Sequence, residues 1–366
     1  MSDLVGWETT RWGALSDLRY GKALRDYREA GGDVPVFGTN GPVGFTDTPQ
    51  TNGPGVIIGR KGAYRGVHYS ELPFWVIDTA FYLAPKSRMD MRWAYYSLQL
   101  ADINALDSGS AIPSTTRESF GAIAVSVPPL PEQQAIAEVL GALDDKIAAN
   151  TALAATADEL IRAEYAGLES ATVRIQDVAE SLRASVDPAS VDPTSLYVGL
   201  EHVGRRHMWL TGSGIADDVS SAKTHFQKGD VLFGKLRPYF HKVALAPQDG
   251  ICSTDILVVR ARGADTSSVL LAALSSDAVI EQVVAASEGT RMPRTSWKDL
   301  ASIEIKWPQE HVAGALAARL DSVRDTALAA IAENRTLAAT RDALLPQLMS
   351  GKLRVRDAEA AASAVI

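Results

Sequence analysis

Two clusters of cationic and aromatic side chains stand in glycine-containing stretches of the chain. The first runs from Gly59 to Gly66 and the second from Gly234 to Lys242. Arginine offers a planar pair of donors that fits the O6 and N7 atoms of guanine, and glycine lets a backbone approach a phosphate closely. Each cluster alone could be a charged hairpin tip, but the repeated Lys/Arg–Tyr composition favours contact with DNA. The candidate contacts are Arg60, Lys61, Tyr64, Arg65, Lys235, Arg237, Tyr239, His241 and Lys242.

Two further kinds of polar segment could add to such contacts. The stretch from Gly38 to Gly44 carries Thr39 and Asn40, and it is equally typical of a plain structural turn. A proline motif occurs twice, around Pro113 and Pro293, and its hydroxyl groups beside arginine suit phosphate. The alternative for this motif is a polar connection leading into a strand. Its candidate residues are Thr115, Thr116, Arg117, Arg291, Arg294 and Thr295.

Motifs of several enzyme classes are missing from the sequence. No Gly-x-x-x-x-Gly-Lys-Ser/Thr loop for ATP phosphates occurs, and no Gly-x-Gly-x-x-Gly follows a predicted strand. The histidines show no His-x-x-x-His spacing. The single cysteine, Cys252, excludes an intramolecular disulfide and a cysteine-rich zinc site. We therefore expect no catalytic residue, metal or cofactor in this chain.

One fragment is similar to part of a metal-dependent nuclease site. Glu304 and Lys306 have the Glu-x-Lys spacing, and Asp299 lies upstream of them. The positions that correspond to Glu304 and Lys306 in the first half of the chain hold Ala124 and Ser126. Side chains alternate between the two faces of a strand, so the simpler interpretation is a strand whose polar side faces water.

The chain contains an internal repeat with a long period. Pro113 corresponds to Pro293, Pro128 corresponds to Pro308, and the tetrapeptide Leu-Ala-Ala-Thr occurs at both 153–156 and 337–340. The offset between the copies grows by one heptad inside the helical segment, which keeps a helical stripe facing the same way. We therefore expect two similar halves, each with one globular part and one long helix.

The two long helices are predicted over residues 131–165 and 309–345. Apolar residues there step by four and three, which is the spacing of a coiled-coil seam. Asn150 and Asn334 hold corresponding seam positions, where an amide either fixes the register of the helices or points to solvent at a helix edge. Other seam residues are Ile136, Leu140, Leu143, Ile147 and Leu320.

Short β-rich runs, punctuated by Gly, Pro and Asn, fill the rest of each half. A helix is expected near residues 93–106 in the first half and near residues 268–286 in the second. The fold class is therefore α+β, with two α+β domains separated by two long helices. We place the first domain at residues 1–127, the first helix at 128–168, the second domain at 169–307, the second helix at 308–350 and a C-terminal tail at 351–366.

Composition and charge fit a soluble protein with no general affinity for nucleic acid. Hydrophobic residues make up 46% and charged residues 22% of the chain, and the net charge is −8. Most of the negative charge lies in residues 126–170, whereas both predicted domains are nearly neutral. This argues against a protein that coats nucleic acid, but a local DNA contact remains compatible with it. The polar N-terminus and the absence of a long apolar run predict a cytoplasmic protein without a membrane span.

Several segments along the chain carry a family resemblance. The stretch Pro128-Pro129-Leu130-Pro131-Glu132-Gln133-Gln134, with Leu143 to Ile147 and Asn150, closely resembles the start of the central helix in type I restriction-modification specificity subunits. Residues 341–353 resemble the family's C-terminal signature. Residues 21–24, 38–44 and 77–80 resemble its N-terminal target recognition domain. The second copy departs from the pattern, because Gln309-Glu310-His311 replaces Glu-Gln-Gln.

The resemblance implies a non-catalytic subunit in which each domain reads one half of a bipartite double-stranded DNA site. The two helices would pack antiparallel, set the gap between half-sites and dock two DNA adenine methyltransferase subunits. Those partners would supply adenosyl-methionine, and separate motor–nuclease subunits would supply ATP use, Mg and cleavage. The resemblance adds Lys22 to the DNA contacts, and Glu132, Gln133, Gln134 and Leu344 to the helix and partner contacts. The competing class is a non-DNA interaction protein with two binding domains held apart by a helical hairpin.

Overall fold

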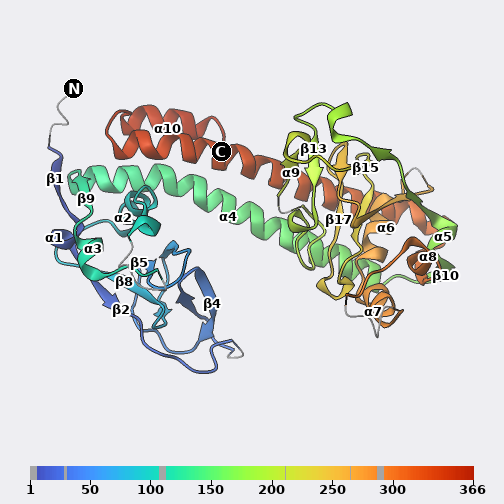
Figure 1. The fold of residues 1–366 in the computed structure, drawn as a ribbon, viewed down its shortest axis with the longest axis horizontal. Helices are drawn as coiled ribbons and strands as arrows, with labels where there is room; N and C mark the ends of the chain where they lie inside the picture. Colours follow the sequence, from blue (N-terminus) through green and yellow to red (C-terminus); the bar gives the residue numbers. More distant parts are fainter. Residues whose placement is uncertain (1–5, 29–30, 107–112, 211, 264, 287–291) are drawn as a thin grey trace. The chain divides into compact units, whose positions relative to one another are not determined.

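The computed structural model describes residues 6–28, 31–106, 113–210, 212–263, 265–286 and 292–366. It divides into two compact units, one formed by residues 1–147 with 335–366 and the other by residues 148–334 (Figure 1). Each unit combines an α+β domain with part of both long helices. The predicted α+β class is therefore confirmed.

Within its described residues, the domain of the first unit contains three small sheets and four short helices. Its core holds Trp12, which lies 6.2 Å from Trp93 and 5.9 Å from Phe120 between ring centroids. The strands are β1 (Glu8–Arg11) paired with β9 (Ala124–Val127), the sheet β2 (Ser16–Tyr20), β8 (Ala80–Pro85), β5 (Gly55–Gly59) and β6 (Val67–Ser70), and the sheet β4 (Gly41–Thr46), β3 (Val34–Gly38) and β7 (Trp75–Val76). The helices are α1 (Trp12–Leu15), α2 (Met91–Gln99), η1 (Ile103–Ala105) and α3 (Arg117–Gly121).

The described residues of the second unit's domain also form three sheets. Helix α6 (Ser267–Leu274) is buried along almost its whole length in the core. The strands are β10 (Ser170–Arg174) paired with β20 (Glu304–Pro308), the sheet β11 (Ala179–Leu182), β19 (Ile256–Ala261), β16 (Val231–Gly234) and β17 (Val243–Leu245), and the sheet β12 (Ser185–Val186), β15 (Lys223–Phe226), β18 (Gly250–Cys252), β13 (Leu196–Val198) and β14 (Gly214–Ile215). The remaining helices are α5 (Ile175–Val178), η2 (Pro188–Ser190), η3 (Leu200–His202), η4 (Ala216–Asp218), η5 (Pro238–Phe240), α7 (Asp277–Ala286) and α8 (Trp297–Ala301).

The two four-stranded sheets share one topology. The order β2-β8-β5-β6 in the first unit corresponds to β11-β19-β16-β17 in the second, and every neighbouring pair is antiparallel. The register agrees as well, because Gly59 lies opposite Ala80 and Gly234 lies opposite Ile256. The internal repeat predicted from the sequence is therefore present in the fold.

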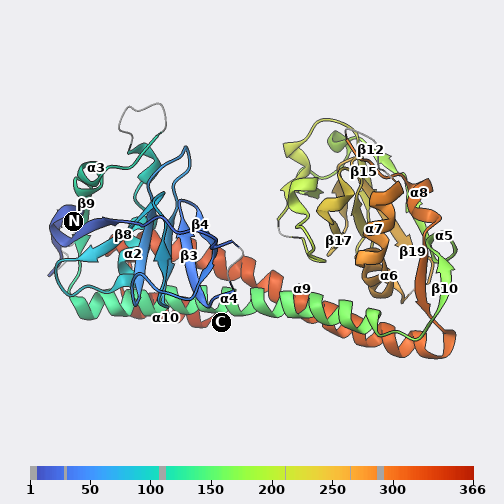
Figure 2. The ribbon, with the colours of Figure 1, turned by 90° about the horizontal axis from the view of Figure 1, so that it is seen from below.

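The long helices α4 (Leu130–Ala166) and α9 (Glu310–Met349) lie side by side in each unit (Figures 1 and 2). In the first unit Asp144 accepts a hydrogen bond from Arg341 at 2.7 Å. In the second unit Glu164 pairs with Arg319 at 2.9 Å, and Asn150 donates to Glu333 at 2.6 Å. Positions farther along α4 thus pair with positions nearer the start of α9, so the predicted antiparallel arrangement is confirmed.

Asn150 is only 5% exposed, so its amide lies in the seam rather than at a solvent edge. Its counterpart Asn334 donates to Thr151 at 3.3 Å. Both amides therefore link the two helices, which favours the register-fixing interpretation.

Three local expectations differ from the structure. The helix expected near residues 93–106 ends at Gln99 and is followed by a short 3-10 turn. The helix expected near 268–286 is two helices, α6 and α7, separated by Ser275 and Ser276, whose hydroxyls bond backbone carbonyls. The tail expected after residue 350 contains helix α10 (Val355–Ser363), which buries Ala358 and Ala362 against the first unit. In the described ranges no single helix has the length and hydropathy to cross a membrane; only the bent pair α6 and α7 passes that test together.

Candidate nucleic-acid interface

Each unit joins its basic cluster to its copy of the proline motif by the same backbone pairing. In the first unit the amide of Gly62 donates to Pro113 at 3.0 Å, and that of Thr115 donates to Arg60 at 2.9 Å. In the second unit Arg237 donates to Pro293 at 2.8 Å, and Thr295 donates to Lys235 at 3.0 Å. Segments that are far apart in the sequence therefore form one surface in each unit.

Arg60 and Lys235 hold corresponding positions and make corresponding side-chain contacts. Arg60 Nη1 donates to the carbonyl of Asp78 at 3.0 Å, and Lys235 Nζ donates to the carbonyl of Thr254 at 2.6 Å. Both carbonyls belong to the residue that lies two positions before the strand β8 or β19. Each cation is therefore held at the end of its sheet. Burial of the Lys235 ammonium group and the nearby charge of Arg294 lower the pKa of Lys235.

Tyr20 lies between two arginines in the first unit. The guanidinium carbon of Arg60 is 4.8 Å from the centroid of the Tyr20 ring, and that of Arg117 is 4.2 Å away. Such cation–π contacts contribute about 0.5–1 kcal/mol at exposed sites. Lys61 and Tyr64 are exposed beside them, and Tyr64 is 71% exposed. The cluster therefore presents three cations and two aromatic rings to solvent.

The second unit builds a comparable surface from different residues. Arg205 lies 3.9 Å from the ring centroid of Phe240, and Arg237 lies 5.9 Å from it. Tyr239 is 50% exposed. Arg237 and His241 flank η5 with left-handed φ angles of 50° and 52°, a conformation that costs about 1–3 kcal/mol for residues other than glycine. The loop is thus held in a strained shape that directs Arg237 and Tyr239 outward.

Four of the predicted DNA contacts are buried, so they cannot contact DNA in this structure. Arg65 is 2% exposed and donates to the carbonyls of Ile103 and Asn104, at 3.2 and 2.7 Å. His241 is 3% exposed, and its Nε2 lies 2.8 Å from the carbonyl of Ser275. Thr115 and Thr295 are 2% and 3% exposed. The predictions were wrong because these side chains point inward, and Arg65 and His241 bond to backbone carbonyls of the domain.

The other predicted contacts lie at or near the two surfaces. Asn40 and Lys22 are exposed, whereas the Thr39 hydroxyl is bonded to the carbonyls of Thr79 and Lys61. Thr116 caps α3, and Lys242 donates to the carbonyl of Leu200. Arg294 is exposed but paired with Asp255. Arg291 lies outside the described residues.

The glutamate and glutamine at the start of α4 bind the first domain instead of facing a partner. Glu132 accepts from Trp7 Nε1 at 3.0 Å. The buried Gln133 accepts from the Asp90 amide at 3.0 Å and donates to the Pro128 carbonyl at 2.9 Å. Only Gln134 is exposed. The side chains of Ile136, Leu140, Leu143, Leu320 and Leu344 are buried and Ile147 is partly buried, so they build the helix pair.

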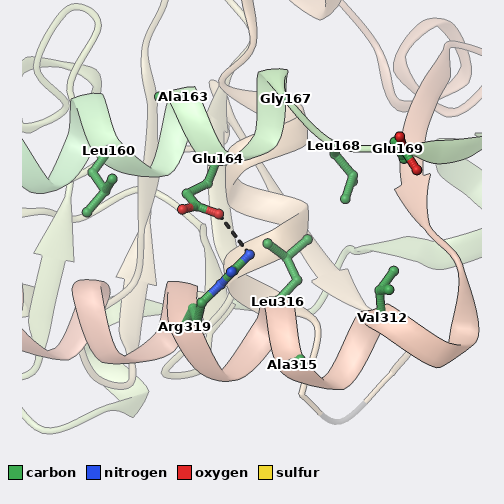
Figure 3. Close-up of a pocket in the computed structure, with 10 residues that line it drawn as sticks. All are labelled: Leu160, Ala163, Glu164, Gly167, Leu168, Glu169, Val312, Ala315, Leu316 and Arg319. Carbon is green, nitrogen blue, oxygen red and sulfur yellow. Dashed lines mark hydrogen bonds and ion pairs between the residues drawn. The ribbon is translucent and has the colours of Figure 1, made fainter.

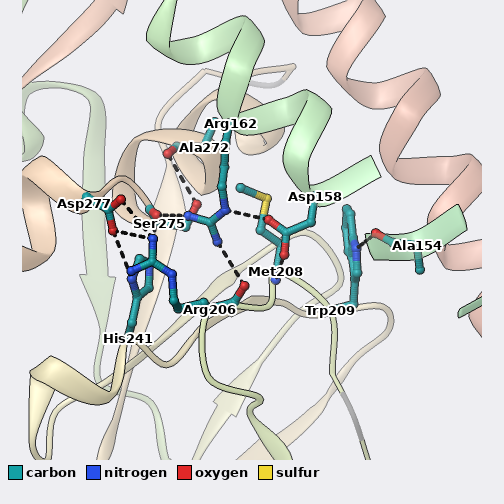
Figure 4. A network of polar contacts seen from close by, with 10 residues as sticks. All are labelled: Ala154, Asp158, Arg162, Arg206, Met208, Trp209, His241, Ala272, Ser275 and Asp277. Atoms are coloured by element: carbon teal, nitrogen blue, oxygen red, sulfur yellow. Dashed lines mark hydrogen bonds and ion pairs between the residues drawn. The ribbon is translucent and has the colours of Figure 1, made fainter. Parts of the chain in front are cut away.

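A polar network that the sequence did not reveal fixes the second domain to α4 (Figure 4). Asp158 is 4% exposed, and it accepts from the Met208 amide at 3.0 Å and from Arg162 Nε at 2.7 Å. Arg162 also donates to the carbonyl of Ser275, which in turn contacts His241. Trp209 Nε1 donates to the carbonyl of Ala154 at 2.8 Å. The network therefore links the helix to the base of the η5 loop.

In the first unit Asp144 has a similar anchoring role. The hydroxyl of Tyr96 donates to Asp144 at 2.6 Å, and Arg341 of α9 donates to the same carboxylate. Burial, together with this carboxylate, raises the pKa of Tyr96 well above its usual range. The tyrosine therefore stays protonated, and it connects α2 to both long helices.

Glu304 and Lys306 lie on the exposed face of β20, where buried and exposed residues alternate. Lys306 Nζ donates to the carbonyl of Ala166 at 2.9 Å, and Asp299 accepts a hydrogen bond from the amide of Ser296, the N-cap residue of α8. The interpretation as an alternating strand is confirmed. Among the side chains that the structure describes, no group of three or more His, Cys, Asp or Glu is placed to hold a metal ion.

A groove lies between the end of α4 and the start of α9 (Figure 3). Its floor is apolar, and the ion pair between Glu164 and Arg319 crosses it. Leu160 is 44% exposed at its edge. The apolar lining also includes Ala163, Leu168, Val312, Ala315 and Leu316.

The N-terminal part of the chain matches a known protein family. Residues 5–157 match the family described as "Type I restriction modification DNA specificity domain". The resemblance to type I restriction-modification specificity subunits is therefore confirmed.

Two curated relatives are the specificity subunits of the type I restriction enzymes EcoDI and EcoprrI from Escherichia coli. The chain is 28% identical to the first over 142 residues and 28% identical to the second over 111 residues. These stretches cover 37% and 30% of this chain, but only 30% and 28% of the two relatives.

The fold is similar to a solved structure over nearly the whole chain. The type I restriction-modification S subunit from M. genitalium matches with a TM-score of 0.64 and 16% identity, covering 95% of this chain and 97% of that one. The long helices and both α+β domains are therefore those of this fold.

Proposed function

We propose that this chain is the DNA sequence-recognition subunit of a type I restriction-modification complex. Each α+β domain reads one half of a bipartite site, and α4 and α9 set the gap between the halves. The observation that carries the proposal is the duplicated surface: in each unit a basic loop is bridged to a Pro-x-Thr segment by matching hydrogen bonds. A paired DNA reader needs such a surface twice.

The cationic side chains of the two surfaces could serve two purposes, contact with DNA phosphates and contact with base edges. The exposed Lys61 and Arg117 and the partly exposed Arg60 in the first unit, with the exposed Arg237 and Arg294 in the second, are donors suited to phosphates and guanine edges. The whole chain nevertheless carries a net charge of −8, and phosphate contact dominates DNA affinity. The chain therefore reads DNA within a complex whose other subunits add cationic surface.

The partner in this proposal is a DNA adenine methyltransferase, present in two copies to match the internal repeat. It supplies adenosyl-methionine and the extrusion of the target base from the duplex. Motor–nuclease subunits supply cleavage. The exposed side chains of Gln134, Glu138 and Glu159 on α4 are available to such protein partners.

The test is methylation-sensitive long-read sequencing of DNA from cells that co-express this chain with the methyltransferase encoded beside it. Cells with the methyltransferase alone are the control. A split motif methylated on adenine only when this chain is present supports the proposal. Equal methylation in both cultures, despite co-purification of the two proteins, contradicts it.

A further inference from the structure

Tyr20 of the first unit and Arg183 of the second occupy the same place in the repeated sheet. Gly59 lies opposite Ala80 and Gly234 opposite Ile256, so two residues farther along the chain Tyr82 of β8 corresponds to Val258 of β19. Arg19 pairs with Tyr82, and Leu182 pairs with Val258. The next residues along the chain, Tyr20 and Arg183, therefore correspond.

Both residues border the candidate interface. Tyr20 is 46% exposed, packs on Phe81 at 4.8 Å between centroids and carries Arg60 and Arg117 on its ring. Arg183 is exposed, and it lies near enough to Lys235 that its charge contributes to lowering the pKa of that lysine, after burial and Arg294.

The residues around this place differ in chemistry between the units. Thr116 and Ser296 cap corresponding helices, so Arg117 of the first unit corresponds to Trp297 of the second. The first unit therefore has an aromatic ring between two arginines. The second has an arginine near Lys235, and at the position of Arg117 it has Trp297, which is partly buried against the core. Such an exchange changes which base edge the two surfaces can read, because an arginine fork and a tyrosine ring offer different contacts.

We propose that this position determines specificity in each half-site, with Tyr20 as a positioning residue for Arg60 and Arg117 and with Arg183 as a direct DNA contact. The inference rests on the proposed function and adds residues to it. The Tyr20 ring holds the guanidinium groups of Arg60 and Arg117 in place before DNA binds. Less side-chain freedom is therefore lost on binding. Arg183 adds a fork of donors for guanine or phosphate beside Lys235.

The experiment uses the full chain co-expressed with its methyltransferase, and the methylated motif is determined by long-read sequencing. The variants are Tyr20→Leu, Tyr20→Phe, Arg183→Ala and Arg183→Lys, with Arg262→Ala as an exposed-arginine control outside the interface. Tyr20→Leu is expected to relax one half of the motif at least tenfold, while Tyr20→Phe, which keeps the ring, retains the wild-type motif. Arg183→Ala is expected to lower methylation and to relax only the other half of the motif, and Arg183→Lys is expected to restore the level of methylation without restoring the base preference.

The results separate this inference from the proposed function. A wild-type chain that directs no split motif contradicts the proposed function itself. A wild-type motif that persists unchanged in Tyr20→Leu and Arg183→Ala overturns the inference alone, as does relaxation of the same half by both. Thermal unfolding of each purified variant is measured alongside, and a motif change in a variant with wild-type stability supports a specificity role.

Discussion

The amide of Thr115 donates to the carbonyl of Arg60 at 2.9 Å, and the corresponding pair, Thr295 and Lys235, makes the same bond at 3.0 Å. In both units the threonine side chain is buried while the following segment turns to cap a short helix. The start of the basic loop is thus held by the same backbone bonds in both units, whereas the rest of the loop differs, because only the second loop forms the 3-10 helix η5. Because both halves share these backbone bonds but carry different side chains, they could recognise different bases from a common framework.

Replacing Arg60 by alanine tests whether the first surface reads DNA. A good bidentate contact between arginine and a base contributes about 1–3 kcal/mol of discrimination. Arg60→Ala in the complex is therefore expected to relax one half of the recognised motif about tenfold or more, and to leave the other half intact. The measurement is the methylation frequency at sites that differ by one base.

Arg88→Ala is the matched control, because Arg88 is exposed and follows the end of β8 opposite to Ala80, the residue that pairs with Gly59 at the start of the basic loop. Relaxation of both halves to the same degree by Arg60→Ala would point to a general loss of affinity, and would contradict base reading by this side chain.

Replacing Asp158 by alanine tests how much the polar network between α4 and the second domain contributes to the free energy of unfolding. Asp158→Ala removes the acceptor for Arg162 and for the Met208 amide. Loss of one partner from a buried ion pair destabilises a protein by about 3–5 kcal/mol, and the partial exposure of Arg162 places the effect at the lower end. Urea unfolding followed by tryptophan fluorescence measures it, since Trp209 packs beside the network.

Glu159→Ala, at the adjacent exposed position, is the control and is expected to change stability by no more than about 0.5 kcal/mol. Equal stability of the Asp158 and Glu159 variants would show that the network does not hold the domain.

Periodic features of the fold could be predicted from the sequence. The four-and-three spacing located the seam at Leu140, Leu143 and Leu320, which are all fully buried. The repeated Leu-Ala-Ala-Thr segment and proline motif located the two halves. Such patterns are visible because every turn of a helix repeats the same constraint.

The inner details of the candidate interface could not be predicted from one sequence. Arg65 and His241 belong to the basic clusters, yet both side chains point inward. The direction of a side chain in a loop depends on its bonds to residues far away in the sequence, here the carbonyls of Ile103 and Ser275. Tyr20 and Arg205 lie far from Arg60 and Phe240 in the sequence, and only the fold brings these residues together. Helix α10 was not predicted because its buried residues, Ala358 and Ala362, are alanines, which give a weak apolar signal.

Helix α10 is expected to be part of the first unit's core. Ala358 has no exposed surface, whereas Ala360 two residues later is exposed. Ala358→Asp places an unpaired carboxylate among apolar side chains and should destabilise the first unit by several kcal/mol, on the order of 3 or more. Ala360→Asp introduces the same charge at the surface and should be nearly neutral. Unfolding curves for the two variants that superimpose would show that α10 does not pack as described.

Stability should also depend on pH through His241. Burial lowers the pKa of His241; the hydrogen bond with Ser275 opposes this effect, and the charges of Arg162 and Arg206 add to it. The unfolded chain, with an ordinary histidine pKa of about 6.5, then binds the proton more readily than the folded chain. The stability contributed by neutral His241 is therefore complete above about pH 6.5 and falls as the pH drops towards the lowered folded pKa.

The slope from this one residue is at most about 1.4 kcal/mol per pH unit. His241→Gln should remove it, so the free energy of unfolding measured in urea between pH 5 and 7 becomes flatter than in the wild type. His68, whose pKa burial also lowers, keeps its own contribution in the first unit. His311→Gln, a change at an exposed position, serves as the control and keeps the wild-type profile. A profile as steep in His241→Gln as in the wild type would mean that His241 is protonated equally in both states, and that its burial against Ser275 does not exclude the charged ring.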